Sequence, residues 1–374
     1  MGARRCAAVA SLVWWVAAIA GCGGGGGSGD ASGSAPVPAP GPPPPPSIAI
    51  SDLQPGQWSE LPGTTIRSVL PNPPQPGYPP NLVLSWSGGT VDAVRSRLLV
   101  WGGGHADYSG NEVYALDLPS LSMQRAIEPS PLTAQSHCTS ALPDGSPTAR
   151  HTYDGLAHVA HTDQFFSVGG ALAPCGTGDG ATWTYDFAAR SWRIAVADSP
   201  MKTRYGTMAV YDAATRLVYV KDQVDFHSYS PATGAYTRLN RADQPVDYHL
   251  SAAIDSRRRK FVMIGDGVQV IDLNTLEMTT MATRQAPAFV GSQQSPGIGY
   301  DPVADRIVAW HGGREVYALD MDTGVWTQVA TNAGPAASAP VHGTFGRWGY
   351  VPAYRVFALV NDIDQNAWVF RLGK

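Results

Sequence analysis

The chain is poor in charge and in helix-forming residues. Charged residues make up 15% of its 374 residues, against roughly 25% in ordinary soluble domains, whereas 41 Gly and 31 Pro are present. This shortage argues against a helical bundle, a coiled coil or a βα-repeat enzyme. A net charge of −4 provides no basic footprint for nucleic acid. Many turn formers together with 11 Trp, 15 Tyr and 9 Phe favour a β protein.

Several catalytic and membrane signatures are also missing. The sequence has no nucleophile elbow, no His-Glu-x-x-His, no Cys-x-x-Cys and no phosphate loop, so no motif decides whether it is an enzyme. Its apolar run, residues 6–20, is shorter than the roughly 20 residues that span a bilayer. Because Arg4 and Arg5 precede this run and small residues follow it, the segment is interpreted as a secretory signal.

The end of that run, Ile19-Ala20-Gly21-Cys22, resembles the bacterial lipobox. The resemblance implies a signal peptide over residues 1–21, cleavage before Cys22 and acylation of its thiol. Gly23, where an inner-membrane lipoprotein would carry Asp, favours an outer-membrane lipoprotein, periplasmic or surface-exposed. The alternative is a plain signal peptide with an incidental cysteine. Residues 22–46 then form a Gly/Ser/Pro-rich linker that is flexible at first and stiff later, and residues 47–374 form the folded domain.

From residue 82 one pattern repeats along the chain. A short apolar strand, a turn and a more hydrophobic strand are followed by a loop, a third strand and a fourth strand. The third strands end at Asp117, Asp186, Ser230, Asp272 and Asp320, and six residues later stand Met123, Trp192, Tyr236, Met278 and Trp326. Such four-stranded antiparallel units cannot cover both of their own faces, so they are expected to stack radially as a β-propeller.

We count six blades, with first strands starting near residues 82, 151, 205, 249, 295 and 343. The sixth blade lacks a fourth strand after residues 367–372, and the segment 57–61 near the start has the pattern of a fourth strand without a blade. Joining the two closes the ring. The prediction is an all-β fold with a single six-bladed propeller. A seventh, degenerate blade within residues 64–81 or 128–149 stays possible.

The Gly pairs at residues 102–103, 169–170 and 312–313, with the aromatic residue that follows in the third strand, resemble kelch repeats. The likeness covers nearly the whole domain, although three blades lack the Gly pair. It implies a propeller of the superfamily that includes galactose oxidase.

Polar and aromatic candidates gather on one predicted face. Links between blades and loops between second and third strands lie at the same end of antiparallel blades, and the first strands line the central channel. Residues at that mouth can bind a carbohydrate or another polar ligand, hold a metal or move protons. The catalytic candidates are His151, Arg204, Tyr205, Tyr248 and His249, and the ligand-binding candidates are His105, Asp107, Tyr108, Arg150, His311, His342 and Arg347. His151, His249 and His342 are the candidates for one divalent metal.

Three functions follow from these residues. The first is recognition of a carbohydrate or another polar ligand. If the protein is an enzyme, a uronate-type lyase is expected, because these residue types resemble those that ulvan lyases and similar propeller enzymes use. That likeness implies that Arg204 pairs with the uronate carboxylate, Tyr205 or Tyr248 acts as acid or base, and His249 or His151 assists. Another is a non-catalytic binding or scaffold propeller in which these residues only join blades.

The third function is a copper oxidase. Tyr248-His249 resembles the copper ligands of galactose oxidase, and Arg204-Tyr205-Gly206 stands where its cross-linked tyrosine lies. The position of the cross-linking cysteine carries His151, which disfavours this reading.

Two cysteines, Cys138 and Cys175, remain after the expected processing. They fall on the same predicted face, and an oxidising compartment favours disulfides. A disulfide between them is therefore predicted, with two unbonded thiols as the alternative.

Overall fold

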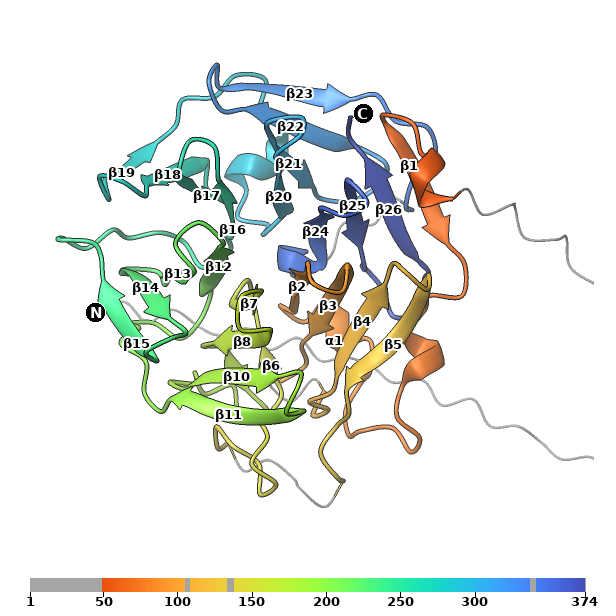
Figure 1. Cartoon of the computed structure of the whole chain (residues 1–374), viewed down its shortest axis with the longest axis vertical. Coiled ribbons are helices and arrows are strands. Elements are labelled where there is room, and N and C mark those ends of the chain that lie inside the picture. The colour runs from red at the N-terminus through yellow and green to blue at the C-terminus, as the bar shows by residue number, and fades with distance from the viewer. Residues whose placement is uncertain (1–48, 105–107, 133–137, 337–340, 374) are drawn as a thin grey trace, which may run out of the picture. The chain divides into compact units, whose positions relative to one another are not determined.

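A computed structural model describes residues 49–104, 108–132, 138–336 and 341–373. The predicted signal, Cys22 and the whole predicted linker lie outside these ranges. Residues 45–374 form one compact unit. In it, 24 strands form six four-stranded antiparallel sheets arranged as the blades of a propeller (Figure 1).

Each blade runs from an inner first strand to an outer fourth strand. Blade one holds β2 (Gly88–Asp92), β3 (Arg97–Trp101), β4 (Val113–Asp117) and β5 (Ser122–Ile127). Blade two holds β7 (Leu156–Val159), β8 (Gln164–Val168), β10 (Thr182–Asp186) and β11 (Ser191–Val196). Blade three holds β12 (Met208–Asp212), β13 (Leu217–Lys221), β14 (Phe226–Ser230) and β15 (Ala235–Arg238).

The other three blades follow the same order. Blade four holds β16 (Ser251–Asp255), β17 (Lys260–Ile264), β18 (Val268–Asp272) and β19 (Met278–Thr280). Blade five holds β20 (Gly297–Asp301), β21 (Arg306–Trp310), β22 (Val316–Asp320) and β23 (Val325–Val329). Blade six holds β24 (Trp348–Val351), β25 (Val356–Leu359), β26 (Ala367–Arg371) and β1 (Gln57–Leu61).

The N-terminal strand closes the ring, as the sequence predicts. β1 pairs with β26 in antiparallel register from Gln57 opposite Arg371 to Leu61 opposite Ala367, and the two strands lie side by side at opposite ends of the colour scale (Figure 1). Trp58 of β1 packs on Trp348 and Phe370 of the same blade. The outermost strand of blade six therefore comes from the start of the domain.

Hydrophobic side chains fill the spaces between neighbouring blades. Six clusters of buried residues are present, and each joins two consecutive blades. The cluster between blades six and one includes Leu98 and Val100 of β3 with Val351 and Val356 of β24 and β25. Each blade buries both faces against its neighbours, which is the reason the four-stranded unit is stable only within the ring.

The predicted third-strand ends and fourth-strand aromatic or Met residues are confirmed, but the predicted blade starts are early. The first strands begin at residues 88, 156, 208, 251, 297 and 348. Leu82 lies in a short helix, α1 (Asn81–Leu84), and Arg150–His151 form a separate short strand, β6, paired with β9 (Ala171–Leu172). The segments before the first strands are links between blades rather than strands.

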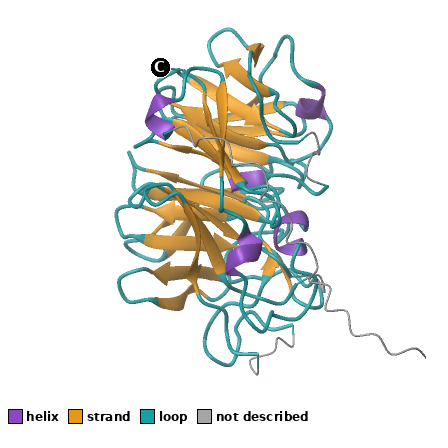
Figure 2. Cartoon of the chain, turned by 90° about the vertical axis from the view of Figure 1, so that its right-hand side faces the viewer, coloured by secondary structure: helices purple, strands orange, loops and turns teal. Residues whose placement is uncertain are grey.

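Regular helix is scarce. Besides α1, the described residues contain four 3-10 turns, η1 (Ile50–Asp52), η2 (Ile66–Val69), η3 (Ala288–Gly291) and η4 (Phe345–Arg347), and Figure 2 shows strands making up almost all regular structure. No helix in the described part of the chain is long and apolar enough to cross a membrane. Residues 64–81 and the described part of 128–149 hold no strand, so the ring has six blades.

Candidate functional site

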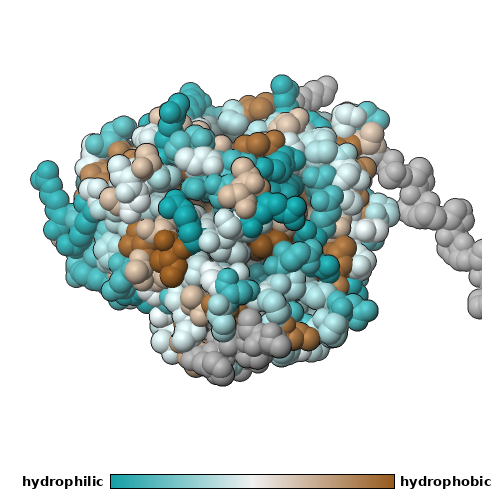
Figure 3. All heavy atoms as spheres, turned by 60° about the horizontal axis from the view of Figure 1, so that its bottom comes forward, coloured by the Kyte–Doolittle hydropathy of each residue, from teal (hydrophilic) through white to brown (hydrophobic). Residues whose placement is uncertain are grey.

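Two ends of the propeller are distinguished below. The link face carries the links between blades and the loops between second and third strands, and the turn face carries the turns between first and second strands. Hydrophilic residues dominate the surface seen in Figure 3, where hydrophobic residues form separate patches. The inner strands β2, β7, β12, β16, β20 and β24 surround the centre of the ring (Figure 1), and residues of all six border a central cavity.

Links on the link face contain strained residues. Trp86, Tyr153, Ser295 and Phe345 have φ angles of 48°, 48°, 44° and 50°, and each lies two or three residues before a first strand. Left-handed backbone is rare for residues other than glycine, and such strain clusters at functional sites. In blade three the same place is taken by Gly206 at φ 62°, where a Cβ would lie 2.4 Å from the Cβ of Tyr248.

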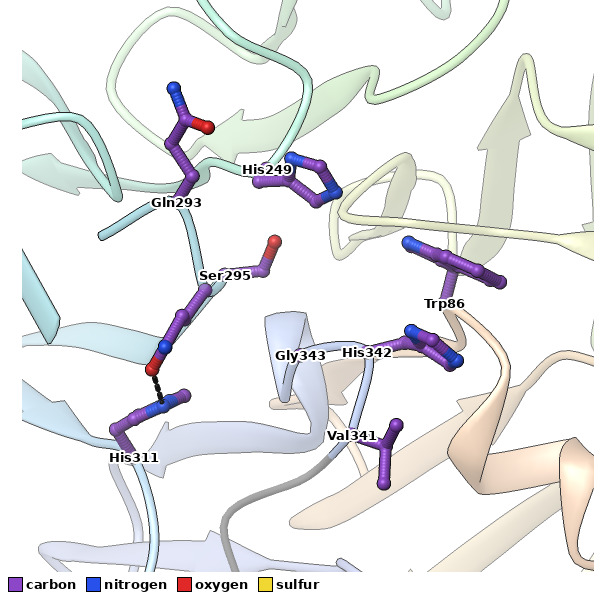
Figure 4. A pocket seen from close by; sticks show the side chains of 9 residues that line it. Trp86, His249, Gln293, Ser295, His311, Val341, His342 and Gly343 are labelled. Atoms are coloured by element: carbon purple, nitrogen blue, oxygen red, sulfur yellow. Dashed lines mark hydrogen bonds between the residues drawn. The ribbon is translucent and has the colours of Figure 1, made fainter. Parts of the chain in front are cut away.

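A pocket of about 240 Å³ opens among these links. Its walls come from the links that precede blades one, four, five and six and from the end of β21. The lining residues are Trp86, His249, Gln293, Gln294, Ser295, His311, Val341, His342 and Gly343 (Figure 4). We call this the mouth pocket. It brings together three predicted site residues, His249, His311 and His342, that are far apart in the sequence.

Three polar atoms of residues that line the mouth pocket are buried without a hydrogen-bond partner among the described residues: Trp86 Nε1, Ser295 Oγ and His311 Nδ1. Two of them lie on links that precede first strands, namely Trp86 Nε1, a donor, and Ser295 Oγ, which can donate or accept. The Ser295 residue is only 1% exposed, and both atoms point into the space between the two side chains (Figure 4). An unpaired buried polar group costs roughly 1–3 kcal/mol. Trp86 and Ser295 also have left-handed backbone conformations. Two unfavourable features, backbone strain and an unpaired polar atom, therefore coincide at each of these two residues of the mouth pocket.

His249 is held by its own link. Its Nδ1 lies 3.0 Å from Asp247 Oδ1, which also accepts the backbone N–H of His249 at 2.8 Å. A carboxylate can only accept, so Nδ1 carries the proton and Nε2 is left to face a ligand. The ring extends into the mouth pocket (Figure 4), and the Tyr248 ring lies against it with centroids 3.7 Å apart. This orienting carboxylate gives His249 the arrangement of a general base.

The other mouth histidines make different contacts. His342 stacks on Trp86 with ring centroids 3.7 Å apart, and His151 lies against the same indole at 5.0 Å. His311 Nε2 lies 2.5 Å from Gln294 Oε1, and burial lowers the pKa of His311. Trp86 therefore contacts both His342, which itself lines the pocket, and His151, which does not.

The predicted metal set does not assemble. Among the described residues one group of three side chains could hold a metal, Asp92, His158 and Asp163, and it excludes His151, His249 and His342. The indole of Trp86 fills the space beside His151 and His342. In the group that does assemble, Arg95 forms ion pairs with both carboxylates, which supplies their counter-charge.

Three predicted ligand-binding residues are structural. The Arg150 side chain is fully buried and pairs with Asp179. Arg347 is also fully buried and donates to the carbonyl oxygens of Ser87, Val360 and Gly343 at 2.8, 2.9 and 2.6 Å. Burial lowers the pKa of Arg347 to about 9.

Tyr108 is the third of these residues. It is buried, and its hydroxyl donates to Glu112 Oε1 at 2.5 Å. The polar groups of these three residues bond to the protein itself, which favours a structural role over the predicted ligand binding.

Arg204 and Tyr205 point toward blade two. Arg204 Nη2 donates to Asp198 at 2.9 Å, and the Tyr205 hydroxyl donates to the carbonyl of Gly176 at 3.0 Å. Neither lines the mouth pocket. Arg204 and Tyr205 therefore lie outside the pocket that contains His249, although their link passes beside Tyr248 at Gly206.

The remaining predictions concern residues 105–107 and the cysteines. His105 and Asp107 lie outside the described residues. Cys138 and Cys175 are both exposed and are not joined by a disulfide in the described chain. A hydrogen bond between the thiols raises the pKa of Cys138, so the two are neighbours, and the disulfide stays a prediction.

Sequence reasoning missed Trp86, Asp247 and Ser295. Asp247 had a usable signal, because an Asp two residues before His249 can accept hydrogen bonds from the local backbone. Trp86 and Ser295 became recognisable only from their backbone conformation.

Comparisons with known proteins give only distant matches. No protein-family model and no curated protein matches the chain. The solved structure of YjhT is 14% identical, with a TM-score of 0.49 over 79% of this chain and 95% of YjhT. TolB from Acinetobacter baumannii is 11% identical, with a TM-score of 0.40 over 66% of this chain and 55% of TolB. Values this low carry no information about the site.

Proposed function

We propose that this protein binds a carbohydrate or another polar ligand in the mouth pocket of its propeller. The observation that carries the proposal is the pair of buried, unpaired polar atoms, Trp86 Nε1 and Ser295 Oγ, in one pocket. A ligand hydroxyl or carbonyl would satisfy both, because hydroxyls donate and accept.

The size and polarity of the mouth pocket support a small ligand. Its volume of about 240 Å³ is below the roughly 300–1,000 Å³ of sites for drug-sized molecules. Gln293 and His249 add an amide and an imidazole to the lining. Of the residues that the structure describes, no Lys, Arg, Asp or Glu lines it, which favours a neutral, hydroxyl-bearing unit such as one sugar ring over a multiply charged ligand.

Proton abstraction by His249 is a second candidate function. The Asp247–His249 pair and the adjacent Tyr248 ring favour it. The role of Arg204 in neutralising a uronate carboxylate is not supported, because its guanidinium pairs with Asp198. A copper or other metal centre at the mouth is not favoured either, because the three histidines do not gather around one point.

We propose an outer-membrane location from the lipobox-like segment that ends at Cys22. Lipidation of Cys22 would attach the chain to the outer membrane, with the linker holding the propeller away from the lipid surface. Labelling with a radioactive fatty acid tests this step, and a Cys22→Ala variant should lose the label.

Ligand binding is tested by saturation-transfer NMR on the purified full chain with a panel of neutral monosaccharides and uronic acids. We expect a signal that Trp86→Phe and Ser295→Ala each weaken. Tyr205→Phe is the matched control, because it changes the same face outside the pocket. A signal that persists in both pocket variants would overturn the proposal.

The second candidate is tested separately. Incubation with uronate polysaccharides should produce unsaturated sugars that absorb in the ultraviolet, and His249→Ala should abolish the absorbance. No absorbance with the unmodified protein would remove the lyase and leave the binding function in place.

A further inference from the structure

A second cavity occupies the central channel on the side of the turn face. Its volume is about 610 Å³, and it is lined by residues of all six inner strands and their turns. It shares no lining residue with the mouth pocket. Exposed turn residues such as Ala93, Ala213 and Ala214 form its rim, so it is entered from the turn face. We call this cavity the axial channel.

Asp154 lies at the inner end of the axial channel. Its residue is 6% exposed, and its Oδ2 accepts the backbone N–H of Ala252 in β16 at 2.7 Å. The backbone of Gly346 also donates to the carboxyl group. No basic side chain contributes to its electrostatic environment, and burial raises the pKa of Asp154 to about 7.

The walls of the axial channel suit a cation on an apolar body. Among the described residues no Lys or Arg lines it, whereas the half-buried Tyr211, Tyr300 and Tyr350 do, together with small Ala and Gly residues. Trp348 also borders it but is 1% exposed and packs in the core between blades five and six. Aromatic rings attract cations through their faces. Asp212 also lines the channel, but its two carboxylate oxygens accept hydrogen bonds from the Arg259 guanidinium at 2.8 and 2.7 Å.

A buried carboxyl group without a counter-ion is costly. Two backbone N–H groups occupy part of the acceptor capacity of Asp154, and a carboxylate has about four lone-pair sites. The remaining sites can accept from an ammonium group, which would supply the missing charge. His158, another titratable residue that lines the channel, is turned to Asp92 and Asp163 at the turn face.

We propose that the axial channel is a second binding site, separate from the mouth pocket, for a primary amine carried on an aromatic or apolar group. Asp154 is the counter-ion of the ammonium, and the aromatic walls contact the apolar body. The amine enters from the turn face.

The test uses benzylamine as the probe and isothermal titration calorimetry on the purified full chain. We expect binding that Asp154→Asn weakens at least tenfold, a loss of about 1.4 kcal/mol or more. The Asn side chain keeps one oxygen for the Ala252 N–H. Benzyl alcohol, which has the same ring without the charge, should bind at least tenfold more weakly.

Two further variants keep the test decisive if Asp154→Asn does not fold. Thr90→Phe should fill the axial channel and abolish benzylamine binding. Trp86→Phe should leave it unchanged, because Trp86 belongs to the mouth pocket. Absence of binding to the unmodified protein, equal binding of benzyl alcohol, or undiminished binding in Asp154→Asn would overturn the proposal and assign Asp154 to cross-linking of the blades.

Discussion

The two ends of the propeller are built differently. On the turn face, four first strands end in an Asp whose carboxylate accepts backbone N–H groups of its own turn: Asp92, Asp212, Asp255 and Asp301. Three of them also pair with arginines. Left-handed residues occur at both ends, in turns such as those of Ser96 and Arg216 as well as in the links at Trp86 and Ser295. The difference is that the turn carboxylates are paired within their own turns, whereas Trp86 Nε1 and Ser295 Oγ in the mouth pocket have no partner among the described residues, which is the reason we propose a ligand there.

The largest expected effect comes from an architectural residue on the link face. Arg347→Met would leave three buried carbonyl oxygens without their donor. We expect the free energy of unfolding to fall by about 3–5 kcal/mol, measured by chemical denaturation. A loss below about 1 kcal/mol would show that burial on this face is not evidence of a structural role.

The raised pKa of Asp154 should make the stability of the protein depend on pH. This pKa rises from 3.8 unfolded to about 7 folded, so the folded state retains a proton that the unfolded chain releases. The free energy of unfolding therefore falls as pH rises from about 4 to about 7. Asn cannot ionise, so the Asp154→Asn variant does not lose this free energy of unfolding. Relative to the natural protein, its free energy of unfolding should therefore rise by on the order of 3 kcal/mol over this pH range. Denaturation at pH 5 and pH 8 measures the change, and a constant difference would contradict it.

A turn-face substitution should have a smaller effect. Arg258→Met removes the partner of Asp255, Asp305 and Asp322 and leaves the fully buried Asp255 carboxylate with backbone donors only. We expect a loss of about 2–3 kcal/mol. The neighbouring Arg257→Met, whose side chain is 64% exposed, is the control and should cost less than about 1 kcal/mol. Equal losses would mean that burial of Asp255 is unimportant.

The smallest stability effect belongs to the mouth pocket. Trp86→Phe and Ser295→Ala remove unpaired polar atoms, so the free energy of unfolding should change by less than about 1 kcal/mol. Thermal unfolding measures it. A large loss of free energy of unfolding in either variant would show that Trp86 or Ser295 has a structural role, like Arg347, and would argue against a ligand site.

The blades of the propeller could be predicted from the sequence, whereas the links between them could not. The blades were predictable because strand pattern, Asp ends and fourth-strand aromatics repeat in register, and the segment 57–61 visibly matched the missing strand. The links between blades could not be predicted, because their sequences do not repeat from one blade to the next. The starts of the first strands were therefore predicted up to six residues too early.

Residue type alone could not separate ligand contacts from structural ones on the link face. Arg347 and His342 look equivalent in sequence, yet the carbonyl oxygens that consume Arg347 include that of Ser87, 260 positions away. His249 and His342 could be assigned to one face because they precede first strands, and His311 because it follows a second strand. The left-handed residues beside them could be recognised only from the backbone conformation.

The pairing of β1 with β26 sets the order of assembly. β1 leaves the ribosome before any blade exists, but its partner, Ala367–Arg371, is made some 300 residues later. Until then β1 has no strand to pair with, although Trp58 can contact blade five, where its indole Nε1 donates to the carbonyl oxygen of Arg314 at 3.0 Å. Long-range pairing of this kind slows folding, so the sixth blade is completed only after Ala367–Arg371 has been made.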